Sequence, residues 1–311
     1  MTTFGKIGLK SDEHLQTRAG PASDNRIPFG LKDGRLVHVD DVERGLQCGC
    51  ACPGCEAPLI ARHGEKNIHH FSHANSASCE GAYETSLHLA AKEVLEEELH
   101  IVLPAVTARL ENNRAPVEFA PQKDYPIDSI ELERKLGATI PDAIAIIAGY
   151  KLAIEIKVTH GIDDDKLSRI RQEGVSTLEI DLSDLPRDLN KDLIRFHVVE
   201  SVERKVWIYN AYADVRLAKL LSSGRRMPVV SRGMAVHVDH CPKPARIWRG
   251  KAYANVIDDC LHCEFNLQYG GDFIICIGAK NANRDSPRVV PLKNSFGAYR
   301  FPRRRSRHFP L

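Results

Sequence analysis

The clearest alternation of apolar and polar positions lies in the middle of the chain. Apolar residues in segment 83–103 recur at the spacing of one helix face, which predicts a helix ended by Pro104. That face carries Leu87, Ala91, Val94, Leu95 and Leu99. Two apolar runs, 140–148 and 151–159, flank Gly149-Tyr150 and predict two strands joined by a short turn. Segment 163–173 then predicts a helix that ends at Gly174.

Shorter segments complete the predicted core. Strands are expected over 106–110, 127–136 and 176–182, although neither face of 127–136 is purely apolar. Segment 185–196 predicts a helix, and 206–221 predicts either a helix or a strand followed by a helix. The resulting order is α-β-β-β-α-β, an α/β core, with no internal repeat.

Length and composition indicate an ordinary globular protein. The chain has 311 residues, of which 43% are hydrophobic and 27% charged, which suggests two domains or one domain with appendages. No apolar run approaches the roughly 20 residues of a membrane span, and the N-terminus lacks the apolar region of a secretory signal. These features predict a cytoplasmic protein, in whose reducing environment cysteines serve as metal ligands rather than disulfides.

The formal net charge of +2 conceals an asymmetry. Residues 284–311 contain seven Arg and one Lys against one Asp, so this tail carries +7 and the remaining chain −5. Aromatic residues alternate with arginines there, a composition suited to phosphates and exposed bases. The candidate DNA contacts are Arg300, Arg303, Arg304, Arg305 and Arg307. A solvated tail without a ligand explains the composition equally well.

The first cysteine cluster predicts a zinc ribbon. Cys52 and Cys55 form a C-x-x-C turn, and His70 and His73 follow at a distance that a hairpin can bridge. Cys79 could replace either histidine, so the ligands are drawn from these five residues. Cys48 and Cys50 are additional thiols, either packed on a preceding strand or competing as ligands. The simpler alternative is a set of buried cysteines with incidental histidines.

The second cysteine cluster has the spacing of a four-cysteine zinc module. Its residues are Cys241, Cys260, Cys263 and Cys276, with 18, 2 and 12 residues between them. The alternative is again buried free cysteines. A site with four protein ligands has no open position for substrate, so both zinc sites are expected to be structural.

Between the clusters, the two predicted strands bring carboxylates and a lysine together. Alternation along 151–159 puts Glu155 and Lys157 on one face. If Gly149-Tyr150 is a two-residue loop, Asp142 pairs opposite Lys157 on that same face. Two neighbouring carboxylates favour Mg²⁺ or Mn²⁺ between them, and an adjacent lysine suits phosphodiester hydrolysis. A cross-strand salt bridge on a half-exposed face is the alternative.

The preceding helix adds a polar stripe of Glu84, His88 and Lys92 at i, i+4 and i+8. Glu84 is a candidate further metal ligand through water, and His88 a candidate contact to the scissile phosphate or support for a carboxylate. A solvated helix face would show the same pattern.

Taken in order, these segments resemble the competence protein CoiA-like family, whose central part is a PD-(D/E)xK nuclease domain. The shared elements are C-P-x-C, H-F-x-H, E-x-x-x-H-x-x-x-K, P-D-A, A-I-E-I-K-V-T-H and E-I-D-L-S, which cover about residues 46–185. The resemblance implies that Asp142 and Glu155 bind the catalytic metal, Lys157 serves the attacking water, and Glu84 is the helix carboxylate. The full Asp, Glu and Lys set argues against a degenerate site.

The predicted organisation is a restriction-endonuclease-like core with a zinc module on each side. The segments are 1–45 at the N-terminus, 46–80 as zinc ribbon, 81–200 as nuclease-like core, 201–235 as helical linker, 236–283 as four-cysteine module and 284–311 as basic tail.

The leading hypothesis is a Mg²⁺-dependent endo- or exodeoxyribonuclease in DNA uptake, recombination or defence against foreign DNA. The alternatives are a DNA-binding accessory protein that does not cut and, third, a scaffold whose zinc modules bind another protein. DNA, single- or double-stranded, is the expected partner; a protein partner or homo-oligomer stays open, and no membrane is expected.

Overall fold

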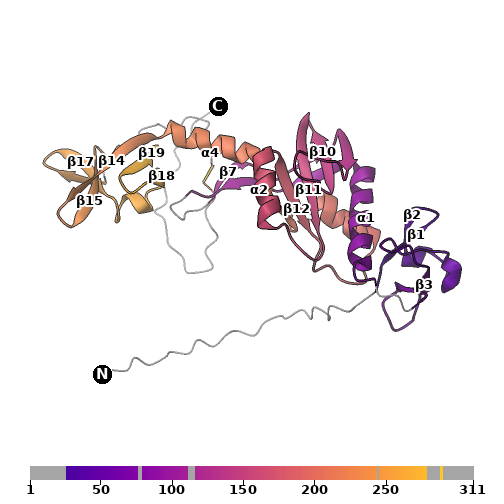
Figure 1. Ribbon diagram of the computed structural model, residues 1–311. Helices are drawn as coiled ribbons and strands as arrows, with labels where there is room; N and C mark the ends of the chain where they lie inside the picture. Colours follow the sequence, from indigo (N-terminus) through magenta and orange to yellow (C-terminus); the bar gives the residue numbers. More distant parts are fainter. Residues whose placement is uncertain (1–25, 76–78, 111–115, 244, 279–287, 290–311) are drawn as a thin grey trace, which may run out of the picture. The chain divides into compact units, whose positions relative to one another are not determined.

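The computed structural model describes residues 26–75, 79–110, 116–243, 245–278 and 288–289 (Figure 1). The chain divides into two compact units. Unit 1 comprises Met1–Glu98, Ile156–Ile162 and Ile180–Val199, and unit 2 comprises Leu99–Glu155, Asp163–Glu179 and Glu200–Leu311. The predicted DNA contacts from Arg300 to Arg307 lie outside the described residues.

Unit 1 begins with a small β module. Strands β1 (Phe29–Lys32) and β2 (Arg35–His38) form one hairpin, and β3 (Leu59–Arg62) and β4 (His70–His73) form another. Ile27 exchanges backbone hydrogen bonds with Phe71, and both side chains are fully buried. The module therefore begins upstream of the predicted ribbon boundary at residue 46, because strand pairing draws residues 27–38 into the same core.

Helix α1 (Ala82–Glu98) follows this module and is shorter than predicted. The predicted apolar face is buried at Leu87, Ala91, Val94 and Leu95. Leu99, however, is 44% exposed and has a φ of +47°, and His100–Leu103 form strand β5, paired with β8 (Lys123–Pro126). The prediction that the helix runs to residue 103 was wrong because hydrogen bonds to a distant strand outweigh local periodicity.

A short helix anchors the C-terminal part of unit 1. Helix α3 (Lys191–Arg195) continues into a π-helix at Phe196–Glu200, so the prediction of a helix over 185–196 is correct only for its last part. Asn190 caps α3 by accepting a hydrogen bond from the Leu193 amide (2.9 Å). Lys191 forms ion pairs with Glu93 and Glu97 of α1 at 3.5 and 2.9 Å.

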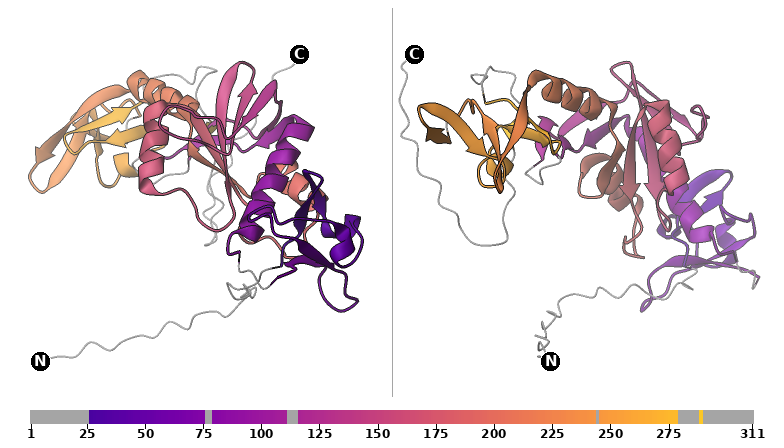
Figure 2. Two further views of the ribbon diagram at one scale, coloured as in Figure 1. Left: turned by 45° about the vertical axis from the view of Figure 1, so that its right-hand side comes forward. Right: turned by 60° about the vertical axis from the view of Figure 1, so that its left-hand side comes forward.

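A five-stranded sheet forms the centre of the predicted core (Figure 2). Its order is β13-β12-β11-β10-β9, from β9 (Ser129–Leu132), β10 (Ala143–Ile147), β11 (Tyr150–Lys157), β12 (Ser176–Asp181) and β13 (Lys205–Tyr209). Strands β9, β10 and β11, helix α2 (Asp164–Glu173) and β12 follow one another as predicted. Strands β5, β6 (Val106–Ala108), β7 (Val117–Ala120) and β8 precede them. The strand predicted over 127–136 forms only at residues 129–132.

The turn between β10 and β11 differs from the predicted one. Ile147 pairs with Tyr150, so the two-residue loop is Ala148-Gly149, with φ values of +49° and +79°. Extending this register places Asp142 opposite Glu155 rather than opposite Lys157. The predicted face survives this correction, because a shift of two residues leaves side chains on the same side of a strand.

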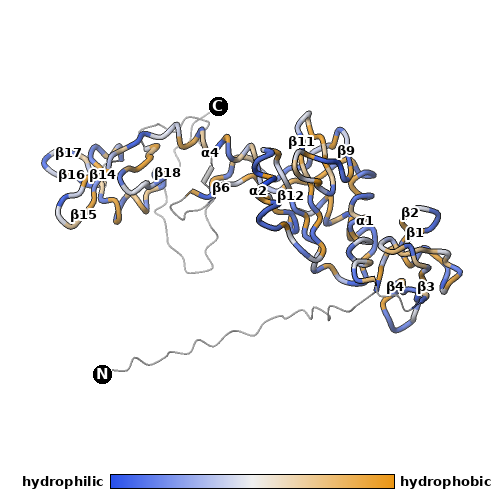
Figure 3. Tube along the Cα trace, in the orientation of Figure 1, coloured by the Kyte–Doolittle hydropathy of each residue, from blue (hydrophilic) through white to orange (hydrophobic). Residues whose placement is uncertain are grey.

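Helix α2 has both of its predicted ends. Asp163 accepts a hydrogen bond from the Lys166 amide at 2.6 Å, and Gly174 ends the helix with a φ of +66°. Only Ile170 is buried in this helix, and Figure 3 shows a mostly hydrophilic segment. Helix α2 contacts β13 at the edge of the sheet.

The segment predicted as a helical linker, 201–235, contains strand β13, helix α4 (Ala211–Ser223) and all of β14 (Arg225–Arg232). The strand-then-helix alternative for 206–221 is therefore correct. Strand β14 enters a six-stranded sheet of order β16-β17-β15-β14-β19-β18. Its other strands are β15 (Ala235–Asp239), β16 (Arg246–Trp248), β17 (Lys251–Asn255), β18 (Asn266–Tyr269) and β19 (Phe273–Cys276).

No helix in the described part of the chain has the length and apolar character needed to cross a membrane.

We expect Gly149→Ala to destabilise the β10–β11 hairpin. A Cβ at this position would meet no atom within 4 Å, so the cost is backbone strain at a φ of +79°, about 1 kcal/mol. The melting temperature should fall by about 2 °C in a thermal scan. Ala148→Asn should act in the opposite direction, since asparagine tolerates the left-handed conformation. Gly64→Ala, where an added Cβ makes only ordinary contacts, is the control; an equal loss there would contradict the expectation.

Candidate functional site

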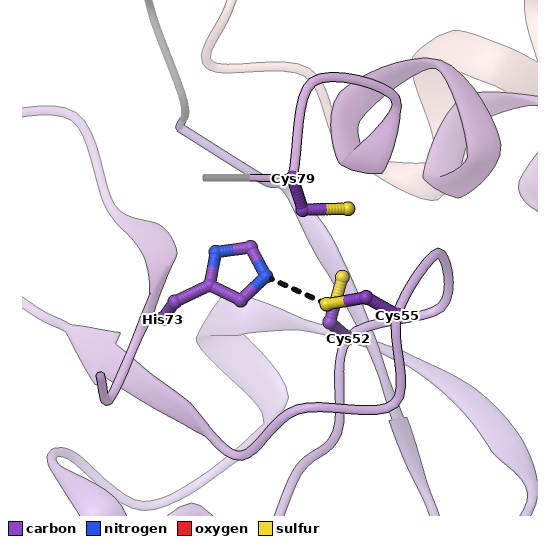
Figure 4. A group of neighbouring side chains, drawn as sticks. All are labelled: Cys52, Cys55, His73 and Cys79. Atoms are coloured by element: carbon purple, nitrogen blue, oxygen red, sulfur yellow. Dashed lines mark hydrogen bonds between the residues drawn. The ribbon is translucent and has the colours of Figure 1, made fainter. Parts of the chain in front are cut away.

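Four side chains of the first cysteine cluster converge on one point. The ligand atoms of Cys52, Cys55, His73 and Cys79 all lie within 4.8 Å of one another (Figure 4). His73 Nε2 and Cys55 Sγ form a hydrogen bond of 3.3 Å. Three sulfurs and one imidazole nitrogen form a donor set typical of structural zinc. The structure therefore contains a Cys/His cluster that could bind zinc.

Local backbone geometry positions these ligands. The Cys52 amide donates to Ala57 O and the Glu56 amide to Cys52 O, both at 2.8 Å, which closes a tight knuckle around Pro53-Gly54. The Gly54 amide points at Cys52 Sγ from 3.4 Å. His73 ends strand β4, opposite Leu59 of β3, and Cys79 lies just before α1. The C-x-x-C turn, the hairpin and the helix start each contribute to the cluster.

The structure selects among the five predicted ligands. His70 is outside the cluster, and its Nδ1 forms a hydrogen bond of 2.8 Å with Ile68 O. Because His70 and His73 are three residues apart on a strand, their side chains leave opposite faces. Cys48 and Cys50 are core residues, whose thiols donate to Leu59 O and Cys48 O at 3.3 and 3.4 Å.

The thiols of the cluster differ in acidity. Burial raises the pKa of Cys52 to about 11. The backbone amide of Ala57 lowers the pKa of Cys55, which is exposed. A bound cation would favour the thiolate form of both, because metal ions bind thiolates and displace their protons.

A second group of possible ligands, Asp40, His63 and His69, lies in the same module. His69 Nδ1 forms a 2.6 Å hydrogen bond with Asp40 Oδ1, and His63 Nε2 forms one of the same length with Val39 O. The two imidazole rings stack with centroids 4.9 Å apart. These contacts account for the group without a metal ion.

In unit 2, the predicted carboxylate Glu155 is buried, with 5% of its surface exposed. Lys166 Nζ donates to Glu155 Oε2 at 2.7 Å, whereas Glu155 Oε1 is buried without a hydrogen-bond partner among the described residues. Burial raises the pKa of Glu155; the nearby Asp142 and Glu179 act in the same direction and Lys166 opposes them. Asp142 and Glu155 are thus electrostatic neighbours, as predicted, although in a different register.

In unit 1, the predicted lysine is paired with a carboxylate. Lys157 Nζ donates to Asp181 Oδ2 at 2.6 Å, and both side chains are about one third exposed or less. Burial alone would raise the pKa of Asp181, but hydrogen bonds from Lys157 and Ser183 outweigh it and lower the pKa. A backbone hydrogen bond lies beside this ion pair: the amide of Leu182, the residue after β12, donates to Lys157 O at the end of β11 at 2.7 Å.

The polar stripe of α1 also lies in unit 1. Glu84 Oε2 accepts a hydrogen bond from the Thr159 hydroxyl at 2.7 Å. His88 Nε2 lies 3.8 Å from Glu84 Oε1, an i, i+4 contact. Lys92, in contrast, is buried with 6% exposure and does not extend the polar stripe into solvent.

Three contact residues were not predicted. Asp181, Lys166 and Thr159 hold Lys157, Glu155 and Glu84, respectively. Asp181 and Thr159 belong to the E-I-D-L-S and K-V-T-H segments. Their place at the ends of apolar strands was the sequence feature that could have marked them as contact residues. Lys166 carries no such signal, because only the packing of α2 brings it to Glu155.

The four C-terminal cysteines surround a common pocket. Cys241, Cys260, Cys263 and Cys276 all line it, together with apolar residues such as Met227 and Ile274. Burial, with the other three thiols, raises the pKa of Cys260 to about 12. Cys241 Sγ donates to Lys243 O at 2.7 Å, and the Gly278 amide points at Cys276 Sγ from 3.3 Å. The predicted grouping of these cysteines is therefore observed, with looser geometry than in the N-terminal cluster.

Comparison with known proteins gave one family match. Residues 42–82 match the family described as "Competence protein CoiA, N-terminal domain". The matched segment contains all four residues of the N-terminal Cys/His cluster and ends at the first residue of α1. It supports a CoiA-like family assignment and does not cover the predicted nuclease core. Neither the curated proteins nor the solved structures that were searched gave a match.

We expect Cys52→Ser to remove one zinc equivalent per chain. Cys52 is fully buried in the cluster, and loss of one thiolate leaves a tetrahedral site incomplete. Zinc content measured by plasma mass spectrometry on the purified chain checks this. His70→Ala is the matched control, since His70 belongs to the same H-F-S-H segment but not to the cluster. Equal zinc in both variants would show that the cluster does not hold the metal.

Proposed function

Since the CoiA match supports a CoiA-like assignment for this chain, we propose that the protein is a metal-dependent deoxyribonuclease acting in a competence-related process such as DNA uptake or recombination. The observation that carries the proposal is the surroundings of Glu155. A buried carboxylate has one oxygen paired with Lys166 and the other without a partner among the described residues, next to a second carboxylate, Asp142.

This arrangement favours a cation. A buried, unpaired carboxylate oxygen is costly, and Asp142 and Glu179 add negative charge around it. Hard divalent ions such as Mg²⁺ or Mn²⁺ prefer carboxylate oxygen ligands. Asp142 and Glu155 would hold the ion, and their common face on the β10–β11 hairpin is consistent with this role.

The bound ion would supply Lewis-acid polarisation of the phosphodiester and a more acidic water. Lys157 follows Glu155 by two residues on β11 and therefore leaves the same face of that strand. Its ammonium group would orient the attacking water and offset negative charge that develops on the phosphoryl oxygens. Asp181 fixes the position of Lys157 through the 2.6 Å hydrogen bond.

Residues of α1 have supporting roles in this proposal. The resemblance implies that Glu84 is a metal ligand through water and that His88 contacts the scissile phosphate or supports a carboxylate. Within unit 1, Thr159 fixes Glu84, and His88 lies 3.8 Å from it. Glu84 is not deeply buried, with 37% of its side chain exposed, so it is accessible to water.

The cysteine clusters would be structural in this protein. Zinc bound by Cys52, Cys55, His73 and Cys79 would hold the N-terminal module together, and zinc bound by the four C-terminal cysteines would stabilise the second one. Each module has only a small apolar core, for which a metal cross-link compensates.

The alternative is a DNA-binding accessory protein without cleavage activity. One observation favours it: Lys157 and Glu155 are each engaged in a short ion pair, with Asp181 and Lys166 respectively. Such pairs occur as structural cross-links in proteins without catalysis. The two functions differ in whether DNA is hydrolysed when Mg²⁺ or Mn²⁺ is added.

We expect Lys157→Ala and Glu155→Gln each to reduce Mg²⁺-dependent DNA cleavage by at least about 100-fold, because each removes a charged group from the reacting centre. The measurement is product formation from labelled single- and double-stranded DNA with Mg²⁺, Mn²⁺ or EDTA. Lys151→Ala is the control, since Lys151 lies on β11 with the same side-chain parity but is exposed at the opposite end. Cleavage that persists in both variants at the Lys151→Ala rate would contradict this site, and absence of cleavage by the wild type would favour the accessory function.

We further expect Cys260→Ser to remove one zinc equivalent without affecting the N-terminal site, because Cys260 is the buried cysteine of its pocket. Zinc content of Cys52→Ser, Cys260→Ser and the double variant checks this. Additive losses support two separate sites, whereas unchanged zinc in Cys260→Ser would show that the C-terminal cysteines are free thiols.

A further inference from the structure

The six-stranded sheet of unit 2 carries polar and aromatic side chains on one face. Its register places Trp248 opposite Lys251, Tyr253 opposite Asp239, and His237 opposite Val230. Directly paired residues and those two positions apart share a face, so these side chains and Arg232 lie on the same side of the sheet.

The opposite face of this sheet is buried around Val238 and Ala254. Val238 and Ala254 pair with each other, are 2% exposed, and pack in a core cluster with Met227 and Cys260. The cysteine pocket lies on this side, lined by the same residues. One face of the sheet is therefore packed around the cysteine pocket. The other, called the free face below, carries side chains such as Trp248 and Lys251 that are exposed among the described residues.

The free face contains a pocket of about 360 Å³. Its lining includes Arg232, His237, Asp239, Trp248, Lys251 and Tyr253. This volume lies within the range of about 300–1,000 Å³ typical of small-ligand sites. One nucleotide or a comparable group would fit in such a space.

The pocket favours an anion. Arg232 forms a bidentate pair with Asp239, at 2.8 and 2.6 Å, which neutralises the one carboxylate in the lining. Lys251 is exposed at the rim, and Arg249 follows directly after Trp248. Within the lining, Lys251 is therefore the remaining fixed charge, and Arg249 adds a second cation beside Trp248. Arg246, paired with Tyr253 on the same face, is bound to Asp258 and Asp259.

The pocket also favours a planar ring. Trp248 lies on β16, the edge strand, and remains 60% exposed although the Arg249 guanidinium lies 4.7 Å from its ring centroid. His237 and Tyr253, which line the same pocket, pack edge to face with ring centroids 5.4 Å apart.

We propose that this pocket binds a nucleotide of single-stranded DNA, with the base stacked on Trp248 and the adjoining phosphate held by Lys251 and Arg249. Aromatic platforms beside cations are the chemistry by which proteins bind single strands, and bases paired in a duplex do not present their faces. The proposal deepens the proposed nuclease function by giving this chain a binding surface for its substrate strand. A protein ligand on the edge strand β16 is less suited to the cations around Trp248.

The test measures binding of a labelled 20-nucleotide oligo(dT) by fluorescence anisotropy, without added Mg²⁺ and in the full chain carrying Lys157→Ala. Trp248→Ala should weaken binding about tenfold or more, since stacking on an aromatic side chain contributes about 1–3 kcal/mol per base. Trp248→Phe should restore most of the affinity. Ile247→Ala is the matched control, because Ile247 is the neighbouring residue on β16, is 68% exposed and leaves the opposite face. Lys251→Ala should reduce the slope of log K against log salt by about 0.7.

A spectroscopic readout separates ligand contact from a structural effect. The chain has two tryptophans, so Trp207→Phe leaves Trp248 as the one emitter. Oligo(dT) should quench its fluorescence, and duplex DNA should do so weakly. Equal affinity of Trp248→Ala and Ile247→Ala, absence of quenching, or a Trp248 signal that responds to protein concentration instead of oligonucleotide would each overturn the proposal.

The outcome is independent of cleavage. If the chain shows quenching and a Trp248-dependent affinity but no Mg²⁺-dependent cleavage, the nuclease function is refuted and the nucleotide-binding pocket is supported. If cleavage depends on Lys157 and Glu155 but the half-saturating DNA concentration is the same in Trp248→Ala and Ile247→Ala, the nuclease function is supported and the pocket proposal is refuted.

Discussion

The central constraint in this protein is that a buried ionisable side chain needs a partner of opposite charge. Glu155 meets it in part, with Lys166 on one oxygen and none on the other in the described chain. Cys52 and Cys260 face the same constraint as thiols, since burial raises their pKa values to about 11 and 12. Further acidic groups lie near each of them: Asp142 and Glu179 near Glu155, and other cysteines near Cys52 and Cys260. Metal ions would satisfy every one of them, which is why the same physical reasoning leads to a carboxylate site and two cysteine sites.

The two cysteine modules have small cores that a metal cross-link would stabilise. Each is built of short strands around a limited set of buried apolar residues. In the N-terminal module the ligands come from a turn, a strand end and a helix start, so a metal would join these three elements. In the C-terminal module the cysteine pocket supports the sheet whose other face carries Trp248 and Lys251. A structural metal would thereby determine how rigidly that face is presented.

Sequence patterns predicted the elements that are defined by local chemistry. The C-x-x-C turn, the capped helix α2 and the apolar strands β10 and β11 were all found near their predicted places, because caps, turns and alternation act within a few residues. The predictions were wrong where pairing between strands distant in sequence determines the structure. Residues 100–103 continue the apolar pattern of α1 but pair with β8, and the hairpin turn falls at Ala148-Gly149 because the pairing of whole strands sets the register. The predicted common face of Asp142 and Glu155 survived, since it depends on parity alone.

By itself, therefore, the sequence determined which residues carry chemistry and on which side of a strand they lie. It indicated a cysteine-rich module at the N-terminus, for which the CoiA match then gave independent support. The tertiary structure decided which of five candidate ligands converge, why His70 does not, and that Lys166, Asp181 and Thr159 hold the predicted polar residues. It also assembled Trp248, Lys251, Tyr253 and Arg232 from three strands into one pocket. Residues that share no local pattern meet only through strand register and packing, and those are fixed by the free energy of the whole chain rather than by neighbouring residues.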